Sequence, residues 1–410
     1  MTFEVSPKLR KTITAMGLTI GLWQIINYFL NWHSRIDMEV YRAGARAFID
    51  NKSLYESPFD VGGIALPFIY PPFGAAILTP FALMSDVVAG IAIILMSAAL
   101  TFLCIFVIAR ALMPRTPELA LMYTALIWPL ALLSEPHTQN ANFGQINVLV
   151  MALCVLDLVP RKHFLPQGTL IGIAAAIKLT PVMLCLYFLL RKDFKAIGFA
   201  ALSGVIVTAL TACIRLSATK EYFLGMLLKM NSTSGAGVGT AYLSNQSIKG
   251  MLARWAPSEE AAMAHQGLID TAWLVIVLLA IALCAHLMLL MLRRGMLIDA
   301  GLVNAGLMLM ISPISWTHHW VWMPLFAMAL IYRWVNTPGN PVELAVSGIA
   351  TWLFCLQIKP QWIFGDLGNE MFQLNFGQKF ILSGYLWLMI AILISLYVSL
   401  LRGSRRTIDS

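Results

Sequence analysis

The stretch VVAGIAIILMSAALTFLCIFVIA, residues 87–109, indicates the fold class of this chain. It contains no charged side chain over its whole length. A helix needs about 20 predominantly apolar residues to cross the hydrocarbon core of a bilayer. The stretch therefore predicts a transmembrane helix, and comparable apolar stretches recur from one end of the sequence to the other.

The composition of the 410 residues agrees with a membrane protein. Hydrophobic residues make up 59% and charged residues 12% of the sequence, and the mean hydropathy is +0.77. Soluble domains carry about 25% charged residues. The net charge is +8, but Lys and Arg form short clusters between apolar segments instead of a basic surface interleaved with aromatics. That pattern marks the cytoplasmic side of a membrane protein and argues against nucleic-acid binding.

Ten segments are clear candidates for membrane spans. They are 12–31, 87–109, 118–134, 143–159, 194–216, 269–292, 296–311, 317–334, 342–357 and 378–401. Two further segments are ambiguous, because prolines interrupt 68–84 and because Lys178 and Pro181 lie in the middle of 168–190.

The basic clusters resolve this ambiguity. Every basic cluster lies on the cytoplasmic side if two choices are made. Segment 68–84 then lies on the membrane surface, and segment 168–190 is split at Lys-Leu-Thr-Pro (178–181). Broken helices of this kind are tolerated where they line a polar cavity. We therefore predict an all-α polytopic fold in one domain, residues 1–410, with 12 spans and both termini cytoplasmic. External loops 32–86 and 217–268 are expected to contribute to an active site.

The first external loop contains a candidate catalytic carboxylate. Residues 38–50 are expected to form a short amphipathic helix, with Arg42 and Arg46 one turn apart on one face. Asp37 precedes this helix. Asp is a favoured N-cap residue, so Asp37 either caps the helix or acts as a general base at the membrane surface.

Two further polar features interrupt apolar segments. Gln145 and Asn147 enter a predicted span, where their amides either bind sugar hydroxyls or satisfy neighbouring helices. Lys178 lies near the middle of a predicted span, where an ionisable side chain is costly and is a candidate functional residue. Its ammonium suits a phosphate group as a point charge.

The densest polar and aromatic cluster is Ser-Pro-Ile-Ser-Trp-Thr-His-His-Trp-Val-Trp, residues 312–322. We expect His318 or His319 to hydrogen-bond or to contact phosphate. The spacing lacks the further Cys or His ligands of a zinc site, and the six cysteines all lie inside apolar segments without a CxxC pair. No metal or other cofactor is therefore expected.

Taken in order, several of these motifs resemble the GT-C polyprenol-phosphate-mannose-dependent mannosyltransferases of glycosyltransferase family 87. The motifs are Ile-Asp-Met-Glu-Val-Tyr (36–41), Tyr-Pro-Pro-Phe (70–73), Phe-Gly-Gln-Ile-Asn-Val-Leu (143–149), Lys-Leu-Thr-Pro (178–181), Asn-Gln-Ser (245–247) and the 312–322 run. The resemblance implies a GT-C membrane fold whose first external loop carries the catalytic Asp.

From these motifs and from the polar residues near them, we predict three groups of site residues. Asp37, His318 and His319 are predicted to be catalytic. The donor is predicted to contact Lys178, Tyr70, Gln145 and Asn147. An acceptor or its headgroup is predicted to contact Arg42, Asn245, Gln246, Arg254 and Trp316.

The expected reaction is inverting α-1,2-mannosyl transfer. Polyprenyl-phosphate-mannose would be the donor, and a mannosylated phosphatidylinositol in the plasma membrane would be the acceptor, with the active site facing the periplasm or cell exterior. A lipomannan- or lipoarabinomannan-branching α-1,2-mannosyltransferase is an alternative within the same class. A lipid or glycolipid transporter is the alternative from another class. It predicts ionisable residues distributed through the bilayer, whereas here they gather in loops on one side.

Overall fold

The computed structural model describes residues 5–31, 35–160, 164–227, 239–336, 348 and 359–406. These residues are mostly helical, and the strands among them form a single two-stranded sheet. The chain divides into two compact units. Unit 1 comprises Met1–Leu22, Cys104–His137 and Thr240–Ser410, and unit 2 comprises Trp23–Leu103 and Thr138–Gly239. Three helices run from one unit into the other: α1 (Pro7–Leu30), α5 (Asp86–Leu112) and α7 (Glu135–Phe143).

Unit 2 contains the first predicted external loop and the predicted broken span. Its further elements are α2 (Ile36–Ile49), β1 (Phe59–Val61), β2 (Ile64–Leu66), α3 (Pro72–Ile77), α4 (Thr79–Ala82), α8 (Asn147–Leu158), α9 (Thr169–Ile177), η1 (Thr180–Leu184), α10 (Cys185–Leu190), α11 (Phe194–Ile214), α12 (Leu216–Glu221) and the π-helical turn η2 (Tyr222–Met226).

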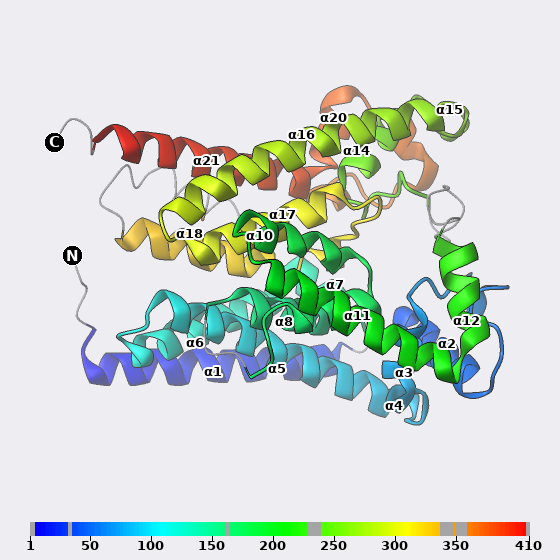
Figure 1. The fold of residues 1–410 in the computed structure, drawn as a ribbon, viewed down its shortest axis with the longest axis horizontal. Helices are drawn as coiled ribbons and strands as arrows, with labels where there is room; N and C mark the ends of the chain where they lie inside the picture. Colours follow the sequence, from blue (N-terminus) through cyan, green and yellow to red (C-terminus); the bar gives the residue numbers. More distant parts are fainter. Residues whose placement is uncertain are drawn as a thin grey trace. The chain divides into compact units, whose positions relative to one another are not determined.

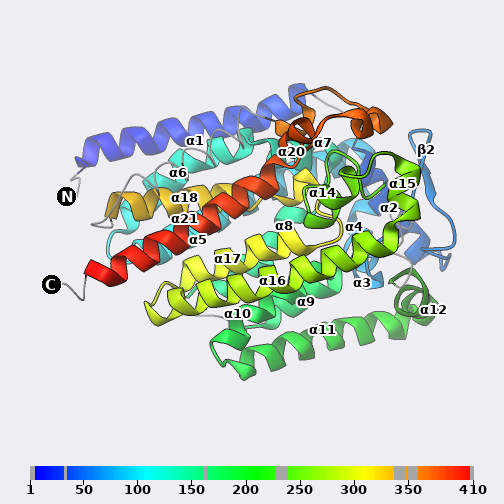
Figure 2. The ribbon, with the colours of Figure 1, turned by 90° about the horizontal axis from the view of Figure 1, so that it is seen from above.

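Helices α9 and α11 pack against each other in unit 2 (Figure 2). A Cβ atom on Gly172 would overlap the carbonyl oxygen of Ala200 and the hydroxyl of Ser203. Small residues therefore let the two backbones approach, as they do in membrane helix pairs. The buried carboxylate of Asp157 accepts the backbone N–H groups of Gly168 and Ile171, both at 2.9 Å, and so satisfies the start of α9.

The two ambiguous apolar segments are both broken in the structure. Segment 68–84 contains only the short helices α3 and α4, so it holds no helix long enough to cross a bilayer. The α9 helix ends at Ile177, and Lys178 follows with an extended backbone before η1 begins at Thr180. The predicted break at Lys-Leu-Thr-Pro is therefore confirmed.

A small β-hairpin departs from the all-α prediction. Strands β1 and β2 pair antiparallel, with Phe59 opposite Leu66, and Gly62 and Gly63 form the turn with φ angles of +59° and +81°. Two consecutive positive φ angles are the signature of a type I′ hairpin turn, which glycine adopts without steric cost. The signal was present in the sequence as Gly-Gly (62–63) between Phe-Asp-Val and Ile-Ala-Leu.

Unit 1 contains residues 240–268 of the second predicted external loop and the C-terminal helices, whereas residues 217–239 of that loop belong to unit 2. Its further elements are α6 (Pro117–Leu133), α14 (Ile248–Arg254), α15 (Glu259–Ala264), α16 (Gln266–Arg293), α17 (Leu297–Ile311), η3 (Thr317–His319), α18 (Met323–Asn336), η4 (Pro360–Trp362), η5 (Gly368–Gln373), α20 (Phe376–Ile381) and α21 (Gly384–Arg406).

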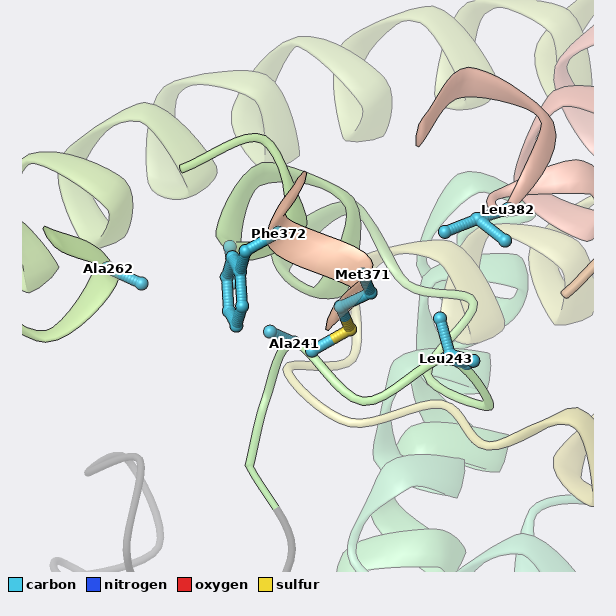
Figure 3. Packing of buried hydrophobic residues seen from close by; sticks show 7 residues of the cluster. Ala241, Leu243, Ala262, Met371, Phe372 and Leu382 are labelled. Atoms are coloured by element: carbon cyan, nitrogen blue, oxygen red, sulfur yellow. The ribbon is translucent and has the colours of Figure 1, made fainter. Parts of the chain in front are cut away.

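Two parts of unit 1 are well defined by packing. Helices α16 and α17 are joined by a short turn at Gly295 and lie side by side in both views (Figures 1 and 2). An apolar cluster gathers the loop segments around α14, η5 and α20 (Figure 3). It consists of Ala241, Leu243, Ala253, Ala262, Met371, Phe372 and Leu382. Burial of this cluster fixes the loops that carry the 240–247 and 359–383 segments.

Five helices of the described residues are long and apolar enough to cross a bilayer: α1, α5, α11, α16 and α21. A sixth span is possible if the bent pair of α6 and α7 is counted as one. Apolar side chains stay exposed along α11 and α16, which suits contact with lipid chains. The predicted count of 12 is thus not reached by helix length and composition, because α8, α10, α17 and α18 are short. The predicted span 342–357 lies almost wholly outside the described residues.

Candidate active site

Asp37 lies in the first turn of α2 and does not cap it. The helix begins at Ile36, two residues earlier than predicted, and its N-cap position is Arg35, which makes no capping side-chain bond. Instead, Oδ2 of Asp37 accepts a hydrogen bond from Nε2 of Gln145 at 2.7 Å. The alternative interpretation of Asp37 as a helix cap is therefore wrong.

The Phe-Gly-Gln-Ile-Asn motif explains how Gln145 reaches Asp37. Gly144 has a φ of +69°, and a Cβ atom at this position would lie 2.7 Å from Cβ of Met38. Only glycine combines this backbone conformation with so close an approach to α2. The backbone N–H of Gln145 then donates to the carbonyl of Asn140 at 2.9 Å, which holds the turn between α7 and α8.

Two tyrosines complete the surroundings of the Gln145 amide. The Tyr41 hydroxyl donates to Oε1 of Gln145 at 2.5 Å and lies 2.8 Å from the Tyr70 hydroxyl. The Tyr70 hydroxyl is 3.4 Å from the same oxygen. Both tyrosines are buried, and their rings meet edge to face.

Lys178 belongs to the same group of side chains. Lys178 follows the end of α9 with an extended backbone, and its Nζ donates to Oδ1 of Asn147 at 2.9 Å. The ammonium also lies 5.5 Å from the centre of the Tyr70 ring, within the range of a cation–π contact. The predicted residues Asp37, Tyr70, Gln145, Asn147 and Lys178 are thus brought together within unit 2.

Burial governs the charge state of Asp37. It raises the pKa of this carboxyl to about 6, although the Gln145 hydrogen bond and the Lys178 charge both act to lower it. Asp37 as a residue is half-buried, whereas Gln145 and Asn147 are buried. A carboxyl group whose pKa burial raises to about 6 suits a general base.

His318 and His319 belong to unit 1, where they form the 3-10 turn η3 together with Thr317. Their rings meet edge to face with centres 4.9 Å apart. His318 is buried and His319 is partly exposed. Trp316 packs edge-on against Tyr242, and its backbone pairs with that of Asn245.

The Asn-Gln-Ser motif braces the loops of unit 1. The Asn245 amide donates to the carbonyls of Thr240 and Pro313 and accepts from the backbone N–H of Ser315. Gln246 donates to the carbonyls of Leu243 and Leu382 and accepts from the N–H of Tyr385. Both side chains are fully buried. The predicted acceptor contact of these amides is therefore not supported, because the protein itself uses their donors and acceptors.

The two arginines predicted to bind a headgroup are also engaged within the protein. Arg254 is fully buried, and its guanidinium donates to the carbonyls of Tyr242 and Asn245 and to the hydroxyl of Ser383. Arg42 donates to the carbonyls of Phe81 and Met84 and pairs with Asp86. These bonds join α2 to the start of α5, and they leave the headgroup contact without structural support.

The sequence analysis did not assign two residues that the structure brings forward. Tyr41 lies four residues after Asp37, which places both on one face of α2, and this spacing was the available signal. Glu135 is buried in unit 1, where it accepts from Gln361 and from Tyr385, each at 3.0 Å. In the sequence, the only indication of its importance was a carboxylate in Ser-Glu-Pro (134–136), where α6 ends and α7 begins.

No group of three or more His, Cys, Asp or Glu side chains among the described residues is placed to hold a metal ion. The expected independence from a metal cofactor stays a prediction.

Comparison with known proteins gives a consistent result. Residues 68–313 match glycosyltransferase family 87. A polyprenol-phosphate-mannose-dependent α-(1-2)-phosphatidylinositol mannoside mannosyltransferase of Mycobacterium tuberculosis is 32% identical over 332 residues, covering 77% of this chain and 74% of the relative. The protein of the same description from Mycolicibacterium smegmatis is 33% identical over 342 residues, with the same coverage.

A further relative from Mycolicibacterium smegmatis is described as a polyprenol-phosphate-mannose-dependent α-(1-2)-phosphatidylinositol pentamannoside mannosyltransferase. It is 32% identical over 307 residues, covering 72% of this chain and 69% of the relative. No solved structure matches the chain. The family match, the extent of these relatives and the apolar helices together show that this chain belongs to glycosyltransferase family 87 and is a multi-pass membrane glycosyltransferase.

Proposed function

We propose that this enzyme transfers mannose from polyprenyl-phosphate-mannose to a phosphatidylinositol mannoside, forming an α-1,2 linkage with inversion at the anomeric carbon. The observation that carries the proposal is the placement of Asp37. Asp37 is half-buried, its carboxylate accepts a hydrogen bond from the Gln145 amide, and it shares one network with Lys178. That arrangement supplies a base and a cation in the unit that contains the first external loop.

The donor and acceptor are inferred from the relatives. Their descriptions name polyprenol-phosphate-mannose and phosphatidylinositol mannosides, and they specify an α-(1-2) linkage. Both substrates are lipids, so an enzyme built of membrane helices with polar residues in its loops fits their common location. We therefore assign these two lipids as the substrate partners of this chain.

The chemical step requires one proton transfer and one displacement. Asp37 takes the proton from the acceptor hydroxyl as its oxygen attacks the anomeric carbon of the mannosyl group. The bond from this carbon to the phosphate oxygen breaks, and polyprenyl phosphate leaves with the electron pair. Attack opposite the leaving group converts a β-linked donor into an α-linked product.

Charge accumulates on the leaving phosphate in this step, and a fixed cation lowers the free energy of the transition state. Lys178 is assigned this role, because its ammonium donates to the Asn147 amide oxygen and so belongs to the same network as Asp37. A histidine of the His318–His319 pair is assigned a second role in the transfer on the resemblance of the 312–322 run to the family motif. Its test is the loss of transfer in His318→Asn or His319→Asn.

The architecture and orientation complete the proposal. We assign the GT-C fold with 12 crossings, the short helices on either side of Lys178 counting as two of them. The plasma membrane holds the enzyme with α2 on the periplasmic or exterior face, because the clusters Lys8–Lys11 and Arg191–Lys195 are then cytoplasmic.

The test is transfer in vitro by purified protein in detergent or vesicles. Wild-type protein is expected to move radiolabelled mannose from polyprenyl-phosphate-mannose to phosphatidylinositol mannosides, and an α-1,2-specific mannosidase should release the label. Asp37→Asn is expected to lower the rate at least 1,000-fold while donor binding persists, because the amide cannot accept the proton. Near-wild-type transfer by Asp37→Asn would remove this residue as the base.

The length of the acceptor separates the remaining alternatives. Relatives acting on phosphatidylinositol mannoside and on the pentamannoside match at similar identity. A series of acceptors from two to five mannoses, with lipomannan as the longest, would distinguish them. Transport of the mannolipid without transfer would instead favour the transporter alternative, which membership of a glycosyltransferase family disfavours.

A further inference from the structure

The amide groups of unit 2 form a continuous chain between the carboxylate and the lysine of the proposed site. From Asp37 the chain runs through Gln145 and Asn147 to Lys178, with separations of 2.7, 3.3 and 2.9 Å between successive polar atoms. Sequence analysis assigned both amides to donor binding. Their polar atoms are instead used within the protein, so another role is needed.

We infer that Gln145 and Tyr41 are positioning residues that hold the Asp37 carboxylate in its orientation and in its ionised form for transfer, and that neither one binds the donor. This inference rests on the proposed function, because it concerns the base of that reaction. It adds Tyr41 to the site and changes the role of Gln145.

The contacts of the Gln145 amide fix its orientation. Its Oε1 atom receives the Tyr41 hydroxyl at 2.5 Å and the Asn147 amide N–H at 3.3 Å. A flipped amide would place an NH₂ group against the NH₂ group of Asn147, and it would set the amide oxygen against the carboxylate oxygen of Asp37. The oxygen must therefore face Tyr41 and Asn147, and Nε2 must face Asp37.

The Tyr41 hydroxyl donates its hydrogen bond to Gln145. Its hydroxyl carries one proton, and that proton is used on Oε1 of Gln145. The neighbouring Tyr70 hydroxyl, at 2.8 Å, is then the donor to Tyr41. The Tyr41 side chain is buried on the same face of α2 as Asp37, so its hydroxyl has little freedom to reorient.

Neighbouring groups also favour the ionised form of Asp37. Among the described residues, three titratable groups interact electrostatically with Asp37: Lys178 from the end of α9, Tyr41 from α2 and Tyr70 from the segment before α3. Of these, Lys178 is the one cationic side chain, and its charge favours the ionised carboxylate. The Gln145 N–H donates directly to the carboxylate, and such a bond to a charged group favours the ionised form.

Removal of the hydrogen-bond donor of Gln145 should therefore change the pH dependence of transfer. In Gln145→Met the side chain keeps its length but donates no hydrogen bond, so the Asp37 pKa should rise. The acid limb of the kcat profile should then move by about one unit or more to higher pH, because a hydrogen bond to a charged group has about this strength. At pH 8.5 most of the activity should return.

A second variant keeps the inference testable if Gln145→Met folds poorly. Gln145→Glu retains an acceptor for Tyr41 but places a second carboxyl group beside Asp37. The two carboxyl groups would share one proton, which raises the pKa of the pair. The acid limb should therefore move to a higher pH than in Gln145→Met.

Tyr41→Phe tests the second positioning residue. It removes only the hydroxyl that donates to the Gln145 oxygen. The acid limb should therefore shift to higher pH by less than in Gln145→Met, and the KM for polyprenyl-phosphate-mannose should stay within about twofold of wild type. Tyr55→Phe is the matched control, since the Tyr55 hydroxyl donates to the backbone carbonyl of Tyr70 and not to this amide chain. Its acid limb should coincide with that of the wild type.

The outcomes separate this inference from the proposed function. A wild-type enzyme that transfers no mannose to any acceptor would overturn the proposed function. An active wild type whose Gln145 variants lose rate equally at every pH, or lose donor affinity without a pH shift, would overturn the positioning role alone. Coincident acid limbs in Tyr41→Phe and Tyr55→Phe would remove Tyr41 from it.

Discussion

At the scale of single residues, hydrogen-bond partners decided what the sequence left open. Asp37 could be read from its position as a helix cap, but its carboxylate turns to Gln145. Asn245, Gln246 and Arg254 were assigned to an acceptor, yet each is buried and bonded to backbone carbonyls of its own unit. Residue type and spacing suggested that these side chains matter, and only their contacts distinguished a reacting group from a bracing one.

The charge state of Asp37 predicts the pH dependence of wild-type transfer. Burial raises the pKa of Asp37 to about 6, and a general base must be ionised to accept a proton. The rate should therefore fall as the pH is lowered through 6 and should approach a plateau above 7. Initial rates at saturating donor between pH 4.5 and 8.5 would measure this limb, and a rate independent of pH down to 5 would contradict it.

Arg254 predicts a loss of stability in unit 1. Arg254→Met leaves the carbonyls of Tyr242 and Asn245 and the hydroxyl of Ser383 without their buried donor. An unsatisfied buried group costs about 1–3 kcal/mol, so the free energy of unfolding should drop by about 3 kcal/mol in all. Thermal unfolding in detergent would show a lower Tm than for Arg115→Met, which changes an exposed arginine. Equal Tm values would contradict the bracing role.

At the scale of elements, the break between α9 and η1 was predictable and its use was not. Lys178 and Pro181 inside an apolar segment indicated a broken helix, and α9 indeed ends at Ile177. The amide oxygen that receives its ammonium belongs to Asn147 at the start of α8, 31 residues earlier in the chain. Local sequence thus located the break, while packing against another helix determined where the lysine points.

The pairing of α9 with α11 predicts a sharp difference between two glycines. Gly172→Ala places a methyl group against Ala200 and Ser203, and such overpacking costs about 1–3 kcal/mol. Gly198→Ala in α11 meets no atom within 4 Å and should be neutral or stabilising by up to ~1 kcal/mol, since alanine favours helix. Thermal unfolding of both variants in the same detergent makes the comparison. A stable Gly172→Ala protein would show that the two helices can separate freely.

At the scale of the whole molecule, the division into two units follows neither the order of the chain nor the predicted loops. Unit 1 combines three separate stretches of sequence and unit 2 combines two. Asp37, Gln145 and Lys178 come from remote stretches and meet in unit 2, whereas the histidine pair belongs to unit 1. Sequence order alone gave no reason to group the motifs in this way.

The proposed orientation predicts which side of the membrane each exposed position faces. In a variant lacking the six native cysteines, Glu56→Cys should react with a membrane-impermeant maleimide on intact cells. Lys195→Cys should react only after the membrane is opened, because it lies in a basic cluster assigned to the cytoplasm. Both positions are exposed in unit 2, so burial does not explain a difference. Labelling of Lys195→Cys on intact cells would overturn the orientation.

The sequence by itself determined the membrane class, the helical character, the broken segments at 68–84 and 168–190, and the family. Each of these depends on local hydrophobicity, on proline and charge within an apolar segment, or on ordered motifs, and all are properties of short stretches. Tertiary structure alone decided that Asp37 accepts a hydrogen bond from Gln145, whose amide oxygen receives the Tyr41 hydroxyl, and that the Asn-Gln-Ser motif and Arg254 brace loops. The physical reason is that a buried polar group must find a partner, and the partner here comes from a distant part of the chain.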